Sequence, residues 1–206
     1  MKQVLYVRMF GKLTLTFNDK QISADSNRSK NVWNLLAYII YNRSRVVSID
    51  ELSTLLKTEE KGSVNPAGAL KTAVFRVRNT LNSLGDGMGH RLLQSVNGGY
   101  IFAPDTEVFV DREHFDTLLQ KAAASADEFS PDDIVEVLGL YNGNFCSMQS
   151  SETWVMPISV YYQNKFAQLL QIAVPVLEKP NGTAKELSFA ERLLKRILIR
   201  NAFTNT

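Results

Sequence analysis

Apolar residues recur at the period of an α-helix between residues 65 and 81. They fall three or four positions apart and share one side of a helical wheel: Leu70, Val74, Val77 and Leu81. The opposite side carries Thr72, Phe75, Arg76 and Asn79, with Lys71 and Arg78 at its margin. Asn65 and Pro66 suit a helix start, because Asn can cap the first turn and Pro fits its geometry. The pattern predicts a helix with one face on a core and one face open.

No Asp or Glu occurs between residues 65 and 81, so the open face is cationic. Arg side chains bind guanine edges or phosphates, Asn binds adenine, and Thr contacts phosphate or a thymine methyl group. Such a face is what a helix needs to read the DNA major groove. A solvated surface helix that happens to be basic would show the same pattern, and this helix alone does not separate the two interpretations.

The chain before this helix predicts strands and two further helices. Alternating apolar positions in 4–17 indicate two strands broken near Gly11, and residues 21–23 indicate a third. A helix follows from about Ser29 to Asn42, with Val32, Leu35, Leu36 and Ile39 buried and Trp33, Ile40 and Tyr41 partly covered. Ser48 and Glu51 form a capping box that opens a short helix to about Lys57. Residues 58–64 then read as a polar loop.

After Leu81 the glycines of 85–89 predict a flexible loop. Residues 90–102 read as a hairpin, because Asn97-Gly98-Gly99 is a strong turn signal between two extended runs. Val108 and Val110 supply one more extended piece. Strands, three helices and a hairpin in this order describe a winged helix.

The second half of the chain predicts only helices. Phe115, Leu118, Leu119 and Ala122 form one apolar stripe, 123–130 is a loop, and a second helix covers 131–141 with Gly143 at its stop. A long helix spans 152–177, interrupted by Pro157 and bent or ended near Pro175. A last helix covers 184–200. No repeat of 34 residues is visible by eye.

Composition excludes several classes of protein. The chain has 206 residues, of which 45% are hydrophobic and 21% charged, as in ordinary globular proteins. No run reaches the length of a membrane span, and residues 1–10 lack a signal-peptide pattern. Cys146 is the single cysteine, so an internal disulfide is excluded, and His90 and His114 alone do not suffice beside it for a structural zinc site. We expect a reducing, cytoplasmic location and no metal or other cofactor.

The net charge of +2 hides an asymmetry between the two halves. Residues 1–104 hold 14 Lys and Arg against 7 Asp and Glu, whereas residues 105–206 hold 9 against 14. A basic first half and an acidic second half indicate two domains, the first with a polyanion as partner.

Residues 5–115 resemble the OmpR-type winged helix of the Streptomyces-antibiotic-regulatory-protein (SARP) family of transcriptional activators. The matching pieces are Phe10-Gly11, Leu35-Leu36-Ala37, residues 47–52, the helix 65–81, Gly99-Tyr100, and Val110-Asp111 leading to Phe115. Residues 140–145 and 152–155 are similar to the tetratricopeptide-like activation domain that follows in that family. Departures are Val77-Arg78 in place of Leu-Arg, Leu55-Leu56 where many members have Trp, and the absence of an Arg shortly after Trp154.

The resemblance implies an α+β fold: a winged helix-turn-helix in 1–110, followed by an all-α tetratricopeptide-like domain in 111–206. It also implies dimers on direct repeats of double-stranded DNA and contact with RNA polymerase through the loop 58–64. The helix 65–81 would read the major groove and the wing 91–102 the minor groove.

The candidate DNA contacts lie in three places: Lys71, Thr72, Phe75, Arg76, Arg78 and Asn79 on the helix, Arg91 and Asn97 on the wing, and Arg43 and Arg45 between the first two helices. For the last pair, a solvated turn is the equal alternative. We find no phosphate loop, nucleophile elbow or zinc-protease motif, so the sequence predicts no enzyme. The hypothesis is a sequence-specific transcription regulator, which the family resemblance implies to be an activator. The alternative is an interaction module whose helical half binds a partner while the winged helix is a scaffold.

The end of the chain carries an unpartnered apolar stripe in the sequence. Leu187, Ala190, Leu194, Ile197 and Leu198 share one side of the helix 184–200. In tetratricopeptide-like repeats a second helix would cover this stripe. We therefore expect the chain to be incomplete at this end, and to self-associate through the last helix as a homodimer.

Overall fold

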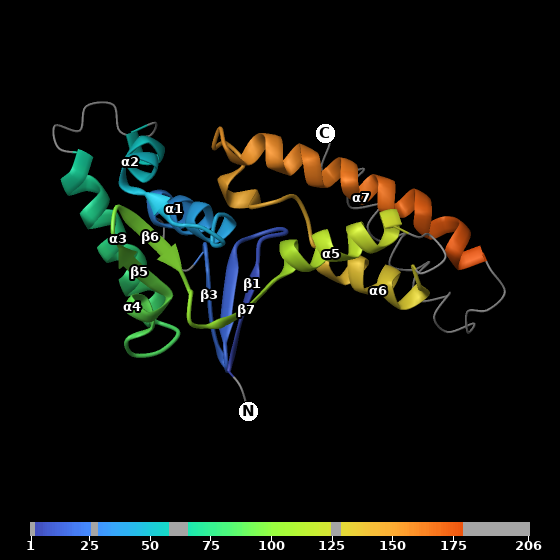
Figure 1. The fold of residues 1–206 in the computed structure, drawn as a ribbon, viewed down its shortest axis with the longest axis horizontal. Coiled ribbons are helices and arrows are strands. Elements are labelled where there is room, and N and C mark those ends of the chain that lie inside the picture. Colours follow the sequence, from blue (N-terminus) through green and yellow to red (C-terminus); the bar gives the residue numbers. More distant parts are fainter. Residues whose placement is uncertain (1–2, 26–28, 58–65, 125–128, 179–206) are drawn as a thin grey trace.

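The chain opens with a sheet that also takes in a strand from a hundred residues later. Our computed structural model describes residues 3–25, 29–57, 66–124 and 129–178; the loop 58–64 and the helix 184–200 of the sequence predictions lie outside them. The four strands are β1 (Val4–Arg8), β2 (Thr14–Phe17), β3 (Lys20–Ser23) and β7 (Glu107–Val110). Their order is β3-β2-β1-β7, with β1 and β7 parallel and the other pairs antiparallel (Figure 1). The three predicted N-terminal strands and the later extended piece are confirmed.

The two faces of this sheet differ. Alternate residues of each strand, among them Leu5, Val7, Leu15 and Val110, are buried in the core. Their neighbours, such as Tyr6 and Arg8, lie on the other face and are exposed. A mostly antiparallel sheet with one solvated face accounts for the alternation seen in the sequence. Gly11 sits at the predicted break with φ +85°, a conformation that other residues adopt only with strain.

Three helices follow, as predicted: α1 (Lys30–Tyr41), α2 (Ile49–Lys57) and α3 (Pro66–Asn82), with the short strand β4 (Val47–Ser48) before α2. Trp33 and Ile40 are fully buried and not partly covered as expected. The Trp33 indole N–H has no hydrogen-bond partner within the described residues. Helix α1 is therefore the central helix of the first half, packed on α2, α3 and the wing.

The loop predicted to be flexible is in part a helix. Helix α4 (Met88–Leu92) leads directly into β5 (Leu93–Val96), which pairs with β6 (Gly99–Phe102) to form the wing. The hairpin is confirmed, but its first strand starts three residues later than predicted. Met88 and Leu92 are one helical turn apart and both buried, so packing outweighs the glycine-rich composition.

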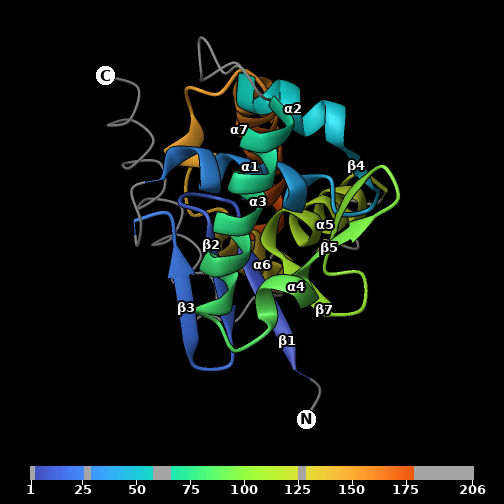
Figure 2. The ribbon, with the colours of Figure 1, turned by 90° about the vertical axis from the view of Figure 1, so that its left-hand side faces the viewer.

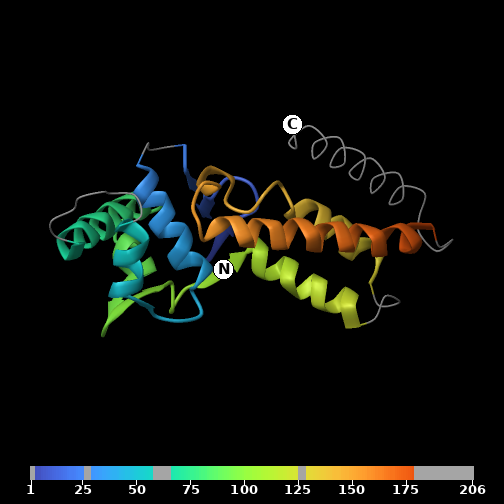
Figure 3. The ribbon, with the colours of Figure 1, turned by 90° about the horizontal axis from the view of Figure 1, so that it is seen from above.

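The second half is helical, as predicted: α5 (Asp111–Ala124), α6 (Pro131–Leu140), the short 3₁₀ turn η1 (Ser147–Gln149) and α7 (Val155–Glu178). Helices α5, α6 and α7 pack on one another (Figure 3). Pro157 does not interrupt α7, because it lies in the first turn, where its missing N–H has no helical partner to lose. The helix likewise continues past Pro175 and ends at Glu178.

One hydrophobic core runs through both halves. The Phe10 ring lies 5.2 Å from Phe115, 5.0 Å from Tyr141 and 5.1 Å from Tyr162, measured between ring centroids. The Asp111 carboxylate accepts hydrogen bonds from the backbone N–H groups of Met9 and Phe10, at 2.8 and 2.9 Å. These contacts cross the predicted boundary between residues 110 and 111, which stays a prediction. No helix in the described ranges is long and apolar enough to cross a membrane.

Candidate nucleic-acid interface

Helix α3 presents two faces, as its sequence pattern predicts. The core face consists of Leu70, Ala73, Val74, Val77 and Leu81, all buried. The outer face consists of Lys71, Thr72, Phe75, Arg76 and Asn79, all exposed. The helix lies at one edge of the molecule in Figure 1 and faces the viewer in Figure 2, with the wing beside it. Contacts with α1, α2 and α4 hold the inner face in place.

The side chains of the outer face are available for a partner. Lys71, Arg76 and Asn79 make no side-chain hydrogen bond or ion pair with the part of the chain that the structure describes. Phe75 is 63% exposed, which is unusual for a phenylalanine. The Thr72 hydroxyl donates to the Gly68 carbonyl at 3.0 Å, so its methyl group and one acceptor position remain open. This surface is cationic, donates hydrogen bonds and has one apolar contact at its centre.

Arg78 makes contacts with the wing. Its Nε and Nη2 atoms donate to the Leu93 carbonyl at 3.1 and 2.9 Å, and Nη2 also donates to Ser95 Oγ at 2.9 Å. The guanidinium lies 6.0 Å from the Tyr100 ring centroid. Arg78 therefore connects the wing to α3 through Nε and Nη2, and its predicted DNA contact stays a prediction.

A second connection fixes the wing through α4. A Cβ atom on Gly89 would lie 2.3 Å from the Arg78 carbonyl oxygen, so the two backbones approach as closely as only glycine allows. The Gly89 N–H donates to Asn82 Oδ1 at 2.8 Å. Helices α3 and α4 are thereby joined with little freedom. The position of the wing relative to the outer face of α3 follows from these contacts.

The tip of the wing projects into solvent. Asn97 and Gly98 form the two-residue turn between the paired residues Val96 and Gly99, and both turn residues are exposed. Gly98, the second turn residue, has φ +82°, a conformation that favours glycine. Arg91, at the end of α4, is exposed as well. The predicted wing contacts Arg91 and Asn97 thus lie on the surface beside α3.

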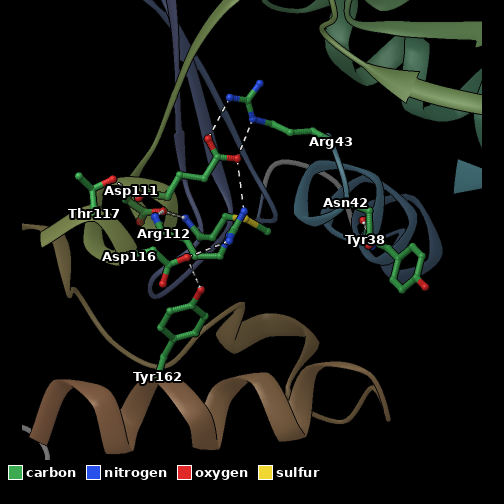
Figure 4. Close-up of polar contacts among 10 residues, drawn as sticks. Tyr38, Asn42, Arg43, Asp111, Arg112, Asp116, Thr117 and Tyr162 are labelled. Atoms are coloured by element: carbon green, nitrogen blue, oxygen red, sulfur yellow. Dashed lines mark hydrogen bonds and ion pairs between the residues drawn. The ribbon is translucent and has the colours of Figure 1, made fainter. Parts of the chain in front are cut away.

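Arg43 lies elsewhere, at the junction with the helical half. Its Nε and Nη2 atoms donate to the two carboxylate oxygens of Glu113 on α5, at 2.8 and 2.9 Å (Figure 4). Glu113 also contacts Arg112, which pairs in turn with Asp116. A bidentate pair of this kind occupies the guanidinium. The pair with Glu113 is the contact of Arg43 in the folded chain, and its predicted phosphate contact stays a prediction.

Arg45 is also occupied. Its guanidinium donates to both carboxylate oxygens of Glu51, at 2.6 and 2.9 Å, and to Asn42 Oδ1 at 2.8 Å. The hydrogen bond from Arg45 holds the pKa of Glu51 at about 2. Glu51 also accepts from the Tyr38 hydroxyl at 2.5 Å. This ion pair is partly exposed, and the predicted phosphate contact of Arg45 stays a prediction.

The same pairing changes the predicted capping box. The Glu51 N–H donates to Ser48 Oγ at 3.1 Å, which is one half of the motif. The Glu51 carboxylate turns to Arg45 and Tyr38 in place of the Ser48 backbone. A complete capping box occurs instead at α6, between Ser130 and Asp133, where the sequence analysis had not placed one.

One residue near the outer face of α3, Asn31, could not be identified from the sequence pattern. A hollow of about 190 Å³ lies between the start of α1 and the outer face of α3, lined in part by Asn31, Thr72 and Arg76. Asn31 follows no pattern that distinguishes it from other polar residues of α1. Only the packing of α1 against α3 brings it to this surface.

No group of three or more His, Cys, Asp or Glu side chains among the described residues could hold a metal ion. Cys146 is buried, and burial raises the pKa of its thiol, which keeps it protonated.

Comparisons with known proteins support the fold. No family model matches the chain, and no curated protein matches it. Among solved structures it is similar to Mycobacterium tuberculosis EmbR in complex with a low affinity phosphopeptide, at 18% sequence identity and a TM-score of 0.66. The similarity covers 86% of this chain and 45% of that one, so the chain spans less than half of its neighbour's length. The predicted α+β architecture, a winged helix followed by a helical domain, is confirmed.

Proposed function

We propose that this protein is a sequence-specific DNA-binding regulator of transcription of the SARP type. One observation carries the proposal: the open face of α3 presents Lys71, Arg76 and Asn79, which have no side-chain partner among the described residues, around the exposed ring of Phe75. A surface helix with no binding role would be expected to pair some of its cations with nearby acids. Here α3 contains no acidic residue at all.

The geometry suits an inserted helix. The major groove of B-DNA is about 12 Å wide and admits one α-helix. With α3 in the groove, Arg76 and Asn79 would face base edges, and Lys71 and Thr72 would lie toward phosphates. Phe75 would contact thymine methyl groups.

The wing would meet the same duplex beside α3. Asn97 at its tip would enter the adjacent minor groove, and Arg91 would bind a phosphate. Arg78 would keep the spacing between helix and wing constant through its bonds to Leu93 and Ser95. Specificity would then rest on α3, and affinity on both elements.

Several parts of this proposal rest on the family resemblance alone. They are activation in preference to repression, binding as a homodimer to direct repeats, and contact with RNA polymerase through residues 58–64. A binding role without catalysis and a cytoplasmic location belong to the same proposal.

A second candidate function is that of a protein-interaction module. Met156, Val160 and Tyr161 on α7 are each about half exposed, and these apolar side chains could contact a protein partner. In that case the winged helix would be a scaffold and would not bind duplexes with any preference.

Selection from a pool of random DNA duplexes separates the two candidates. The full chain should enrich a common sequence, and binding to that sequence should exceed binding to its scrambled form. Arg76→Ala should lose the preference, whereas Lys20→Ala, which removes an exposed cation from β3, should keep it. Enrichment of no sequence at low salt would contradict the proposal and favour the interaction module.

A further inference from the structure

The open face of the four-stranded sheet contains a cleft that the proposed function does not use. The cleft has a volume of about 140 Å³. Its floor is formed by outward-facing residues of β1, β2 and β3, and one wall by the last turn of α6. The floor and the wall therefore come from opposite halves of the chain.

Arg8 supplies a cation in this cleft, and its charge favours the ionised form of the Asp111 carboxyl group. Arg8 is exposed on β1, and its guanidinium makes no hydrogen bond or ion pair with the described residues. The carboxylate of Asp111 also lines the cleft, but its two oxygens accept three backbone N–H bonds, from Met9, Phe10 and Arg112. These amides occupy the carboxylate, so the Arg8 donors remain available to an anion.

Two aromatic rings form an apolar side next to Arg8. Tyr6 and Phe109 are register partners on β1 and β7, and their ring centroids lie 5.7 Å apart. Tyr6 is 54% exposed. On β2 and β3, the Gln21 amide donates to Thr16 Oγ1 at 3.0 Å, which fixes a polar edge on the floor. The lining thus combines the Arg8 cation, the Asp111 carboxyl group, two tilted aromatic rings and oriented polar groups, and small-molecule sites likewise combine apolar and polar groups.

Gly139 lines the wall of the cleft, where it places no side chain. It lies within α6, its φ is not positive, and an added Cβ would meet no atom within 4 Å. Neither backbone geometry nor packing in the described structure requires glycine there. Glycine also weakens a helix relative to alanine. Gly139 lines the cleft, so the absence of its side chain leaves this part of the wall open.

We propose that this cleft binds a small organic carboxylate with an aromatic or branched apolar group. The carboxylate would pair with the Arg8 guanidinium through two parallel hydrogen bonds. The apolar group would lie against Tyr6 and Phe109, under the Gly139 backbone. The cleft is smaller than the roughly 300–1,000 Å³ of sites for drug-sized ligands, which limits the ligand to about the size of benzoate. A ligand here would bridge the sheet and α6.

Titration of the full chain with benzoate and phenylacetate, followed by protein NMR, tests the site directly. Both acids should shift the resonances of Tyr6, Arg8 and Phe109 with a micromolar to low-millimolar Kd. Benzamide, which has the same shape without the charge, should bind about tenfold more weakly or worse. Inorganic phosphate should not compete at equal concentration, since it offers nothing to the aromatic rings.

Two variants and a control locate the binding. Arg8→Gln should weaken benzoate by about tenfold or more, because a charge-assisted pair is lost. Gly139→Leu should fill the space and abolish binding while leaving the Tm unchanged or higher, because leucine favours the helix. Lys20→Gln, on the same sheet but outside the cleft, should bind as the wild type does.

Three results would overturn the proposal. They are equal binding of benzamide and benzoate, unchanged binding in both cleft variants, and no shift at Tyr6, Arg8 or Phe109 at millimolar acid. None of them depends on DNA, so this site and the proposed DNA-binding function can fail separately.

Discussion

Arg76 and Arg78 lie two positions apart on α3 and face different surroundings. Arg76 points to the open side, whereas Arg78 reaches back to the Leu93 carbonyl and Ser95 of the wing. The sequence shows two similar cations on one helix. The partner of Arg78 comes 15 residues later, on a hairpin whose position depends on the tertiary fold, so periodicity alone could not separate the two roles.

Arg76→Ala tests the role of the open side. Because Arg76 would contact base edges, the variant should lose about 1–3 kcal/mol of binding free energy at the preferred site and relax the preference there. Its free energy of unfolding should stay within about 0.5 kcal/mol of wild type. Titrations of the preferred and a random duplex measure the effect. Equal weakening of both would make Arg76 a phosphate contact.

Arg78→Ala should behave in the opposite way. Its loss removes three hydrogen bonds and leaves the Leu93 carbonyl without that donor, so unfolding should become easier by about 1–3 kcal/mol. DNA affinity should fall while the preferred sequence stays the same, because the wing loses its fixed position. Urea denaturation and the duplex titration report the two effects. A changed sequence preference with unchanged stability would indicate that Arg78 contacts the DNA bases.

At the scale of elements, the start of α2 depends on a cluster of polar side chains that only the tertiary fold brings together. Glu51 of α2 binds Arg45 from the preceding loop and Tyr38 from α1. The hydrogen bond to Arg45 is the main cause that lowers the pKa of Glu51 from 4.5 to about 2. The ionised carboxylate therefore stabilises the folded state.

The pH dependence of this cluster has a definite sign. A carboxyl whose folded pKa is depressed contributes stability above its unfolded pKa, and the contribution disappears as pH falls from about 4.5 to about 2. Glu51→Gln should thus be less stable than wild type at pH 6, and the difference should shrink toward pH 2. Asp111, whose pKa burial raises to about 6, titrates in both proteins and cancels in the comparison. A difference that stays constant from pH 6 to pH 2 would contradict the assignment.

The sequence could predict the elements whose apolar residues recur with a strong helical period. The apolar stripes of α1, α3 and α5 and the turn at Asn97 gave the right type and nearly the right bounds. Helix α4 was missed because Gly85, Gly87 and Gly89 suggest a loop, while close packing against α3 selects a helix there. Among the candidate contacts, the residues on the outer face of α3 could be predicted from the helical period. The ion pair of Arg43 with Glu113 could not, because it joins residues 70 positions apart.

At the scale of the whole molecule, the two halves are joined by a partly buried polar network as well as by the core. Asn34 of α1 donates to Glu152 at 2.9 Å and accepts from the Trp154 indole N–H at 2.8 Å. Glu152 is 6% exposed and also pairs with Lys30. The segment before α7 is therefore bound to the central helix of the winged helix.

Thermal unfolding should show one transition for the described structure, because this network and the aromatic cluster around Phe10 span both halves. Asn34→Ala should lower the free energy of unfolding by about 2–4 kcal/mol, since it leaves the buried Glu152 and the Trp154 N–H without this partner. The transition should remain single. Calorimetry measures both quantities, and two separate transitions in the wild type would show that the halves fold independently.

The salt dependence of DNA binding tests the central claim most directly. The dissociation constant of the full chain for its selected duplex should be measured between 50 and 200 mM salt. If the outer face of α3 and the wing neutralise about four phosphates, affinity should fall on the order of a hundredfold across this range, with the selected duplex bound more tightly than the scrambled one throughout. Absence of duplex binding at 50 mM salt, or an affinity that salt does not change, would contradict the account.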